Sequence, residues 1–113
     1  MDLSIIIVNW NVKDLLQKAL QSIKNYPPQK YSYEVIIVDN NSGDNSCQMI
    51  QKKFPEFTLI ANPENSGFAK GNNIGIAKSS GDIILCLNPD TEVHPGSLDF
   101  FVEKLKGDSA LGA

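Results

Sequence analysis

Four short apolar runs alternate along the chain with segments of helical periodicity, and this alternation constrains the fold more than any other feature. The runs cover residues 3–8, 33–38, 57–61 and 82–87. An unbroken apolar run rich in β-branched residues, such as residues 3–8 or 33–38, predicts a strand buried on both faces, as in parallel sheets. Residues 82–87 also read as a buried strand, and residues 57–61 as a shorter one.

The segments between these runs carry apolar residues at the three-four spacing of an amphipathic helix. The clearest covers residues 12–23, with Asn11 as its expected N-cap and Pro27 and Pro28 beyond its end. The same periodicity recurs in residues 47–54, 68–78 and 98–105. Strands that alternate with helices in this way predict an α/β fold: an open parallel sheet with helices on both faces, Rossmann-like and joined by right-handed crossovers.

The composition is that of an ordinary globular chain. The 113 residues suffice for one domain, 42% of them are hydrophobic and 20% charged, and the formal net charge is −3. This balance carries no nucleic-acid signal, and no apolar run approaches the ~20 residues of a membrane-spanning helix. The acidic N-terminus lacks the basic start of a secretory signal, so a cytoplasmic location is expected. Cys47 and Cys86 lack metal-ligand spacing and are predicted to be buried free thiols.

Polar side chains follow all four predicted strands. The segments are Val8-Asn9-Trp10-Asn11, Asp39-Asn40-Asn41-Ser42, residues 62–67 and Asn88-Pro89-Asp90. In open parallel sheets, ligands bind beyond the carboxyl ends of the strands. Such residues also cap helices and turn the chain, but a turn requires only one or two of them. Four polar strand ends at one edge therefore predict a ligand site.

The loop after the first strand argues against two common nucleotide sites. The Gly-x-Gly-x-x-Gly fingerprint of dinucleotide oxidoreductases is absent from VNWNVKD, and the chain has no P-loop motif. Asp39, at a strand end, can accept hydrogen bonds from a base or a ribose. Asn88 and Asp90 can offer oxygens to a hard divalent cation, which a diphosphate ligand would share. Glu92 and His94 are interpreted as surface residues of the next loop.

Three stretches, read together and in this order, resemble a known family. They are SIIIVNWN, EVIIVDNNSGD and NPENSGFAKGNNIGIAKSSGDIILCLNPDTEV, and the resemblance that they carry extends over essentially the whole chain. The sequence resembles the inverting glycosyltransferases of family 2, which have the GT-A fold, and particularly their rhamnosyltransferase-like branch. The resemblance implies transfer of a sugar from a dTDP- or UDP-linked donor to the hydroxyl of a saccharide or lipid-linked acceptor, with inversion, in cell-surface polysaccharide synthesis. It also implies a divalent cation, Mg²⁺ or Mn²⁺, and a cytoplasmic enzyme at the inner face of the membrane, with peripheral association through regions outside this chain.

The resemblance assigns roles to individual residues. Those implied to bind the nucleotide are Val8, Asn9, Trp10, Asp39, Asn73 and Asn88, and the implied metal ligand is Asp90. In this reading Trp10 packs on the base, although a core aromatic is the alternative, and Asp39 contacts the base. Asn88 stands where the family motif has its first aspartate, so an amide replaces a carboxylate there. Lys70 either approaches the phosphates or is an exposed helix lysine.

The chain is shorter than the catalytic domains of that family. We therefore expect residues 1–113 to form the donor-nucleotide part, with the acceptor half and the catalytic base outside this chain and no catalytic residue within it. Such a piece is expected to be inactive alone. Two alternatives remain open: a nucleotide-sugar-binding module without turnover, and a sugar nucleotidyltransferase. The second should carry a glycine-rich, basic loop after the first strand, and VNWNVKD is neither.

Overall fold

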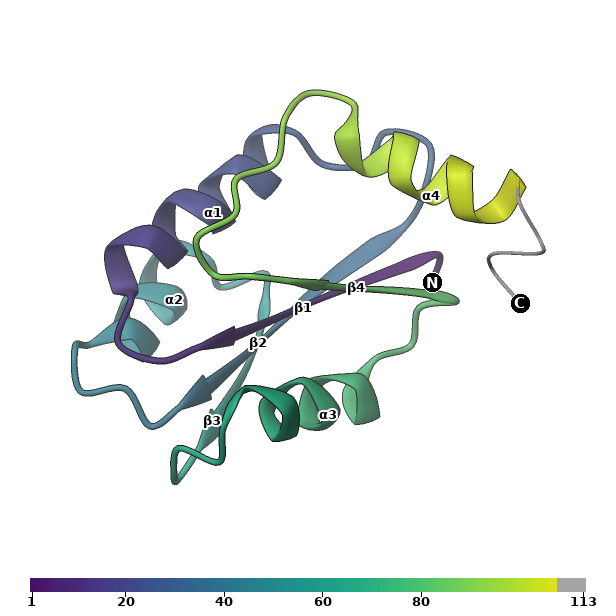
Figure 1. Ribbon diagram of the computed structural model, residues 1–113. Helices are drawn as coiled ribbons and strands as arrows, with labels where there is room; N and C mark the ends of the chain where they lie inside the picture. The colour runs from purple at the N-terminus through teal and green to yellow at the C-terminus, as the bar shows by residue number, and fades with distance from the viewer. Residues whose placement is uncertain (108–113) are drawn as a thin grey trace.

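The computed structural model describes residues 1–107, which form a four-stranded parallel sheet flanked by helices (Figure 1). Its elements are β1 (Leu3–Asn9), α1 (Lys13–Asn25), β2 (Tyr33–Asn40), α2 (Ser46–Lys53), β3 (Thr58–Asn62), α3 (Phe68–Lys78), β4 (Ile83–Leu87) and α4 (Ser97–Gly107). The predicted order of strands and helices is confirmed.

The strand order is β3-β2-β1-β4, and all three pairings are parallel. In Figure 1, α1, α2 and α4 cover one face of the sheet and α3 covers the other. The predicted fold class, an open parallel sheet with helices on both faces, is therefore confirmed. The register pairs Ser4 with Glu34 near the amino ends of β1 and β2, and Asn9 with Asp39 at their carboxyl ends.

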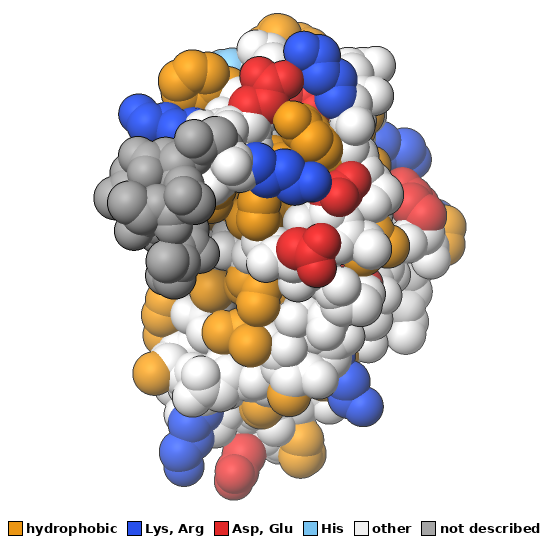
Figure 2. Space-filling model, turned by 90° about the vertical axis from the view of Figure 1, so that its right-hand side faces the viewer, with side chains coloured by type: hydrophobic (Ala, Val, Ile, Leu, Met, Phe, Trp, Pro, Cys, Tyr) orange, Lys and Arg blue, Asp and Glu red, His pale blue; other side chains and the backbone are white. Residues whose placement is uncertain are grey.

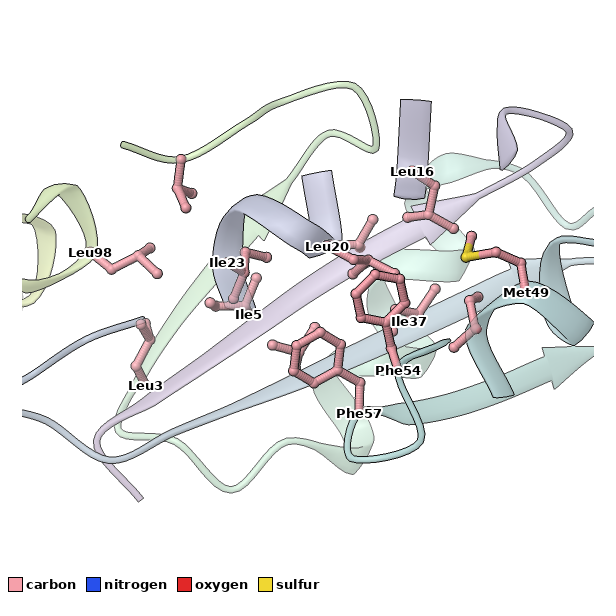
Figure 3. Packing of buried hydrophobic residues seen from close by; sticks show 14 of the residues in the cluster. Leu3, Ile5, Leu16, Leu20, Ile23, Ile37, Met49, Phe54, Phe57 and Leu98 are labelled. Carbon is pink, nitrogen blue, oxygen red and sulfur yellow. The ribbon is translucent and has the colours of Figure 1, made fainter. Parts of the chain in front are cut away.

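Each face of the sheet has its own apolar core, because side chains alternate between the faces along a strand. The larger core joins Ile5 and Ile37 of the sheet to α1, α2 and α4 (Figure 3). Within it the rings of Phe54 and Phe57 stack with their centroids 5.7 Å apart. The smaller core, under α3, consists of the buried residues Ile6, Val8, Ile36 and Val38 with Ile60 and Ile74 beside them.

Two glycines allow α3 to lie close to β1. A Cβ on Gly75 would stand 2.5 Å from Cγ2 of Ile6, and one on Gly71 would stand 2.7 Å from Cγ1 of Val8. Both distances are shorter than van der Waals contact, so a side chain at either position would push the helix away from the sheet. The spacing Gly71-x-x-x-Gly75 places both on one helix face.

Replacement of Gly75 by leucine should therefore destabilise the fold. The gain in helix propensity is about 1 kcal/mol, but overpacking and the separation of α3 from β1 should outweigh it, for a net loss of about 2 kcal/mol. Urea denaturation measures the change. The control is Gly43→Ala, where an added Cβ meets nothing within 4 Å, and which should shift the free energy of unfolding by less than about 0.5 kcal/mol. Equal stability of the two variants would contradict the close approach of α3.

β4 corrects the prediction of a buried fourth strand. It lies at the edge of the sheet, and α3 packs over β1 and β2 rather than over β4. Ile84 is consequently 38% exposed, and the thiol of Cys86 is exposed as well. The prediction that Cys86 is buried is wrong for this reason, and Cys47 is only half-buried.

The surface of the described residues carries no strong charge patch on the face seen in Figure 2, where acidic and basic side chains are intermixed. Among residues 1–107, no helix has both the length and the apolar character that crossing a bilayer requires. 

Glu34 joins the segments at the amino ends of the strands. Its Oε2 accepts hydrogen bonds from the hydroxyl of Ser4, from the hydroxyl of Ser80 at 3.0 Å and from the amide of Ser80 at 2.7 Å. The amide of Gly81 in turn donates to Oγ of Ser4 at 2.8 Å. Burial raises the pKa of Glu34, but the hydrogen bonds from Ser4 and Ser80 outweigh it, so the pKa lies below its ordinary value of 4.5.

This carboxylate should make stability dependent on pH. Because the folded-state pKa is lowered, the contribution is present above pH 4.5 and is lost as the pH falls through the folded-state pKa. The measurement compares urea unfolding of the parent chain and Glu34→Gln between pH 7 and pH 3. The difference in the free energy of unfolding should be largest near neutrality and should shrink in acid. A difference that is constant over this range would show that the charge of Glu34 contributes nothing.

Candidate functional site

A buried polar network lies where β1 and β2 end. Nδ2 of Asn9 donates to Oδ1 of Asp39 at 2.8 Å. The hydroxyl of Ser42 donates to the same oxygen at 2.7 Å, and the amide of Ser42 donates to Oδ2 at 2.9 Å. Asn9 is 0% exposed and Asp39 is 2% exposed. The parallel register brings these two residues together, because it pairs them directly at the carboxyl ends of their strands.

The Asp39 carboxylate determines how the Asn9 amide is oriented. The opposite orientation would bring the carbonyl oxygen of Asn9 against Oδ1 of Asp39, where two acceptors would repel each other. In the observed orientation, Oδ1 of Asn9 is buried without a hydrogen-bond partner among the described residues. An unsatisfied buried acceptor costs about 1–3 kcal/mol. This oxygen is therefore the acceptor of the network that the described residues leave unsatisfied.

The loops after β1 and β2 are bound to each other. The amide of Asn11 donates to Oγ of Ser42 at 3.0 Å, and the amide of Gly43 donates to Oδ1 of Asn11 at 2.8 Å. Asn11, Asn41 and Asn45 all have positive φ, between 55° and 66°, a region that asparagine tolerates better than most residues. Asn11, Asn41 and Asn45 thus serve the backbone conformation of these loops.

The predicted N-cap is wrong. The side chain of Asn11 is bound to Gly43, and Val12 stands at the N-cap of α1 without a capping side chain. Instead, Oδ2 of Asp44 accepts a hydrogen bond from the amide of Lys13 at 3.0 Å, so the cap comes from the neighbouring loop. Burial raises the pKa of Asp44, but hydrogen bonds from Ser46 and Lys13 lower it below its ordinary value of 3.8.

A second set of amides joins β2, β3 and the start of α3. Nδ2 of Asn62 donates to Oδ1 of Asn40 at 3.0 Å and to Oγ of Ser66 at 2.8 Å. Nδ2 of Asn40 donates to the carbonyl of Gly67 at 3.1 Å. The sequence placed these residues at the strand ends without assigning them a role. Their contacts show that they hold the first turn of α3 against the sheet.

The residues predicted to contact the base lie in different surroundings. Trp10 is 52% exposed, which excludes the alternative of a core aromatic. The side chain of Val8 is 5% exposed and lies under Gly71, so α3 covers it. Asn73 is exposed and points away from the sheet, because Gly71 and Gly75 form the buried side of α3. The predicted contact of Asn73 with a nucleotide stays a prediction without support from the geometry.

The segment Asn88-Pro89-Asp90 forms a turn beyond β4, in which the amide of Thr91 donates to the carbonyl of Asn88 at 3.0 Å. Asn88 and Asp90 are exposed. Within residues 1–107, no group of three or more His, Cys, Asp or Glu residues is arranged to hold a metal ion. Asp90 with Asn88 thus offers a hard cation one carboxylate and one amide oxygen, a set that suits a cation whose other ligands are diphosphate oxygens and water.

Glu92 and His94 are exposed, as predicted. The amide of His94 donates to Oγ of Ser97 at 3.1 Å, and the hydroxyl of Ser97 donates to the carbonyl of His94 at 2.8 Å. These bonds shape the loop that leads into α4.

Cys47 of α2 lies next to the network. Burial, followed by a hydrogen bond to Asp39 and the negative charges of Asp39 and Asp44, raises the pKa of its thiol to about 11. A thiol reacts with electrophiles as the thiolate, so Cys47 should be unreactive at neutral pH.

The two cysteines should therefore differ in their reaction with iodoacetamide at pH 8. Exposed Cys86 should be alkylated first, and Cys47 at least about tenfold more slowly, because few of its thiols are ionised. Peptide mass spectrometry gives the rate at each position. Cys86→Ser is the control, since it should abolish the fast reaction. Equal rates at the two positions would contradict the placement of Cys47 beside Asp39.

A four-stranded parallel sheet with helices on both faces and polar side chains at its carboxyl edge defines an α/β protein of the Rossmann-like class. Residues 4–113 match the sequence model of the family described as Glycosyl transferase family 2. The chain belongs to this family.

Curated relatives include poly-beta-1,6-N-acetyl-D-glucosamine synthases from two staphylococci. The protein of Staphylococcus aureus strain MSSA476 is 29% identical over 113 residues, which is 98% of this chain and 27% of that protein. The protein of Staphylococcus epidermidis strain RP62A is 29% identical over 114 residues, with the same coverage of both chains. The chain thus spans about a quarter of the length of these relatives.

Solved structures share the fold. TarS 1–349 of S. aureus in complex with UDP-GlcNAc has a TM-score of 0.83 and 23% identity, over 95% of this chain and 32% of that one. The mannosyltransferase PcManGT of Pyrobaculum calidifontis, in complex with GDP-Man and Mn²⁺, has a TM-score of 0.78 and 21% identity, over 92% of this chain and 31% of that one. These likenesses confirm the predicted GT-A fold.

Proposed function

We propose that the chain is the donor-nucleotide part of a glycosyltransferase that transfers a sugar from a nucleoside diphosphate sugar to an acceptor hydroxyl with inversion. Membership of Glycosyl transferase family 2 supports the activity. The observation that carries the assignment to this part of the molecule is the Asn9–Asp39–Ser42 network, which places hydrogen-bond acceptors at the carboxyl edge of the sheet beside an exposed tryptophan. In this proposal the catalytic base is contributed from outside residues 1–113.

The base of the donor contacts Asn9, Trp10 and Asp39. Uracil and thymine present an imide N–H, which suits the unpartnered oxygen of Asn9 and the remaining acceptor capacity of Asp39 Oδ2. Trp10 offers an exposed ring on which the base can stack. Because Asp39 is 2% exposed, binding includes a shift of the side chains that cover it. The donor is therefore UDP- or dTDP-linked; the UDP-GlcNAc complex of TarS supports uridine, and a rhamnosyltransferase-like enzyme would use dTDP.

Asn88 and Asp90 hold the diphosphate side of the donor. Asn88 bonds a ribose hydroxyl, and Asp90 is the one protein carboxylate for a divalent cation, Mg²⁺ or Mn²⁺, shared with the diphosphate. When bound, such a cation offsets the charge that develops on the leaving diphosphate. The Mn²⁺ in the PcManGT complex supports this assignment.

The acceptor of the whole enzyme is a saccharide or a lipid-linked acceptor, in cell-surface polysaccharide synthesis. The poly-beta-1,6-N-acetyl-D-glucosamine synthases among the relatives support this class of product. The enzyme works in the cytoplasm, at the inner face of the membrane, which it reaches through regions outside this chain.

Calorimetry with UDP, dTDP and GDP, each with and without Mn²⁺, tests the proposal. UDP or dTDP should bind more tightly with Mn²⁺, and Asp90→Asn should remove this dependence and weaken binding with Mn²⁺ at least about tenfold, the equivalent of 1.4 kcal/mol. Trp10 is the sole tryptophan, so its fluorescence should change on binding. Asp39→Ala should weaken binding with and without the metal.

The control for Asp90→Asn is Asp82→Asn, an exposed carboxylate at the other end of β4. It should bind nucleotide and Mn²⁺ like the parent chain. Thermal unfolding shows whether Asp39→Ala is still folded under the conditions of the titration. Mn²⁺-independent binding that Asp90→Asn leaves unchanged would contradict the proposal, as would an unaltered Trp10 emission at saturation.

A further inference from the structure

The ring of Trp10 is exposed, yet the residues on both sides of it are bound to the loop after β2. Before it, Nδ2 of Asn9 donates to Oδ1 of Asp39 at 2.8 Å and to Oγ of Ser42 at 3.3 Å. After it, the amide of Asn11 donates to Oγ of Ser42 at 3.0 Å. The backbone that carries the Trp10 ring is therefore held on both sides. 

Ser42 is the residue that these contacts share. Its hydroxyl accepts hydrogen bonds from Nδ2 of Asn9 and from the amide of Asn11, and it donates to Oδ1 of Asp39 at 2.7 Å. A hydroxyl group has one donor and two acceptor lone pairs, so all of its hydrogen-bonding capacity is used. Ser42 therefore has no hydroxyl hydrogen bond left for a ligand, and it acts on a ligand site through the neighbours that it holds.

Ser42 also orients the carboxylate of Asp39. The amide of Ser42 donates to Oδ2 of Asp39 at 2.9 Å, while its hydroxyl donates to Oδ1, so one residue binds both carboxylate oxygens. A carboxylate that is bound through both oxygens cannot rotate without losing a hydrogen bond. The orientation of the Asp39 carboxylate and the position of the Trp10 backbone thus depend on the same serine.

Two further hydrogen bonds join the loops after β1 and β2. The amide of Gly43 donates to Oδ1 of Asn11 at 2.8 Å, and the amide of Lys13 donates to Oδ2 of Asp44 at 3.0 Å. With the bonds of Ser42, they tie the first loop to the second from Asn9 to Lys13. The bond between Gly43 and Asn11 does not involve Asp39, so it can be removed without touching the carboxylate.

An exposed aromatic ring on a well-held backbone is suited to bind a flat ligand. A ring on a mobile loop would lose conformational entropy when the ligand bound, and this loss would weaken the affinity. In the donor site proposed above, the base stacks on Trp10 and bonds to Asp39, so the ring and the carboxylate need a constant relation to each other. Ser42 is the residue that connects them.

We propose that Ser42 is a positioning residue of the donor site. It sets the backbone of Trp10 and the carboxylate of Asp39 in one geometry, and it does not itself contact the donor. This inference rests on the proposed function, because it is the nucleotide that requires the geometry. The order that Ser42 gives to Trp10 is a property of the free chain and can be measured without a ligand.

Relaxation of the ¹⁵N-labelled chain, measured by NMR without ligand, tests the positioning. The backbone order parameter of Trp10 should be about 0.85 in the parent chain, the value of rigid backbone, and should fall toward about 0.6 in Ser42→Ala. Ser42→Thr keeps the hydroxyl and should restore the parent value. Asn11→Gly is a second variant in case Ser42→Ala does not fold. It removes the bond from Gly43 but none of those of Asp39, and it should also lower the order parameter.

Calorimetry with UDP measures the consequence for the donor site. Ser42→Ala should weaken UDP binding at least about fivefold, the equivalent of roughly 1 kcal/mol, because the base then meets a mobile Trp10 and a less restrained Asp39. Ser42→Thr should bind UDP within about twofold of the parent chain.

The matched control is Ser4→Ala. The hydroxyl of Ser4 also donates to a carboxylate, that of Glu34, but at the amino ends of the strands. Loss of this hydroxyl should lower the thermal stability, as the loss of Ser42 does, because each change breaks hydrogen bonds to a carboxylate. It should alter neither the order parameter of Trp10 nor the affinity for UDP.

The proposal is overturned if Trp10 keeps the parent order parameter in both Ser42→Ala and Asn11→Gly, or if Ser4→Ala lowers it as much. It is also overturned if Ser42→Ala loosens Trp10 and still binds UDP as tightly as the parent chain. Failure of the parent chain to bind any nucleotide would contradict the proposed function instead, and the order parameters would still decide whether Ser42 positions Trp10.

Discussion

The burial of β1 is the constraint on which the rest of the structure depends. This strand is hydrogen-bonded on both edges and covered on both faces, and all seven of its residues are buried. A polar side chain in such a strand needs an internal partner. β1 has two polar residues, Ser4 and Asn9, and the register of β2 pairs each of them with a carboxylate, Glu34 and Asp39. The packing of the central strand thus places a half-buried acid, Glu34, near the amino ends of the strands and a buried acid, Asp39, at their carboxyl ends.

The two carboxylates, Glu34 and Asp39, differ in how completely their surroundings are hydrogen-bonded. Glu34 is enclosed by the hydroxyl of Ser4 and by the turn at Ser80, so its hydrogen bonds close the amino edge. Asp39 likewise accepts hydrogen bonds from the amide and the hydroxyl of Ser42, but its partner Asn9 retains a buried oxygen without a hydrogen bond. At both ends of β1 a polar side chain is paired with a carboxylate of β2. The hydrogen bonds are complete at the amino end, but at the carboxyl end one oxygen, Oδ1 of Asn9, is left without a partner. Ligands bind at the carboxyl ends of the strands in this class of fold.

The sequence predicted the strands and helices well, but not which of them lie next to one another in space. Apolar periodicity depends on local spacing, so the strands and helices lie within a few residues of where they were expected. That periodicity does not specify the order of the strands in the sheet, so the sequence did not predict that β4 and Cys86 are exposed. The capping of α1 by Asp44, a residue 31 positions from Lys13, is a tertiary contact that local rules assign to Asn11 instead. The strand-end rule correctly grouped Asn9 with Asp39, but their hydrogen bond and the role of Ser42 depend on register, which a single sequence does not specify.

The carboxyl ends of the strands are organised unevenly, and this has an energetic consequence for the proposed donor site. On the proposed base side, Asn9 and Ser42 donate three hydrogen bonds to Asp39, so its side chain is ordered before any ligand arrives. On the diphosphate side, Asp90 is exposed and has no hydrogen-bond partner within the described part of the chain. Ordering an exposed side chain costs conformational entropy, which a ligand must offset from its own interactions. In the proposed donor site, the base would thus meet an ordered carboxylate once the side chains that cover Asp39 have shifted, whereas the diphosphate and its cation would order Asp90 as they bind.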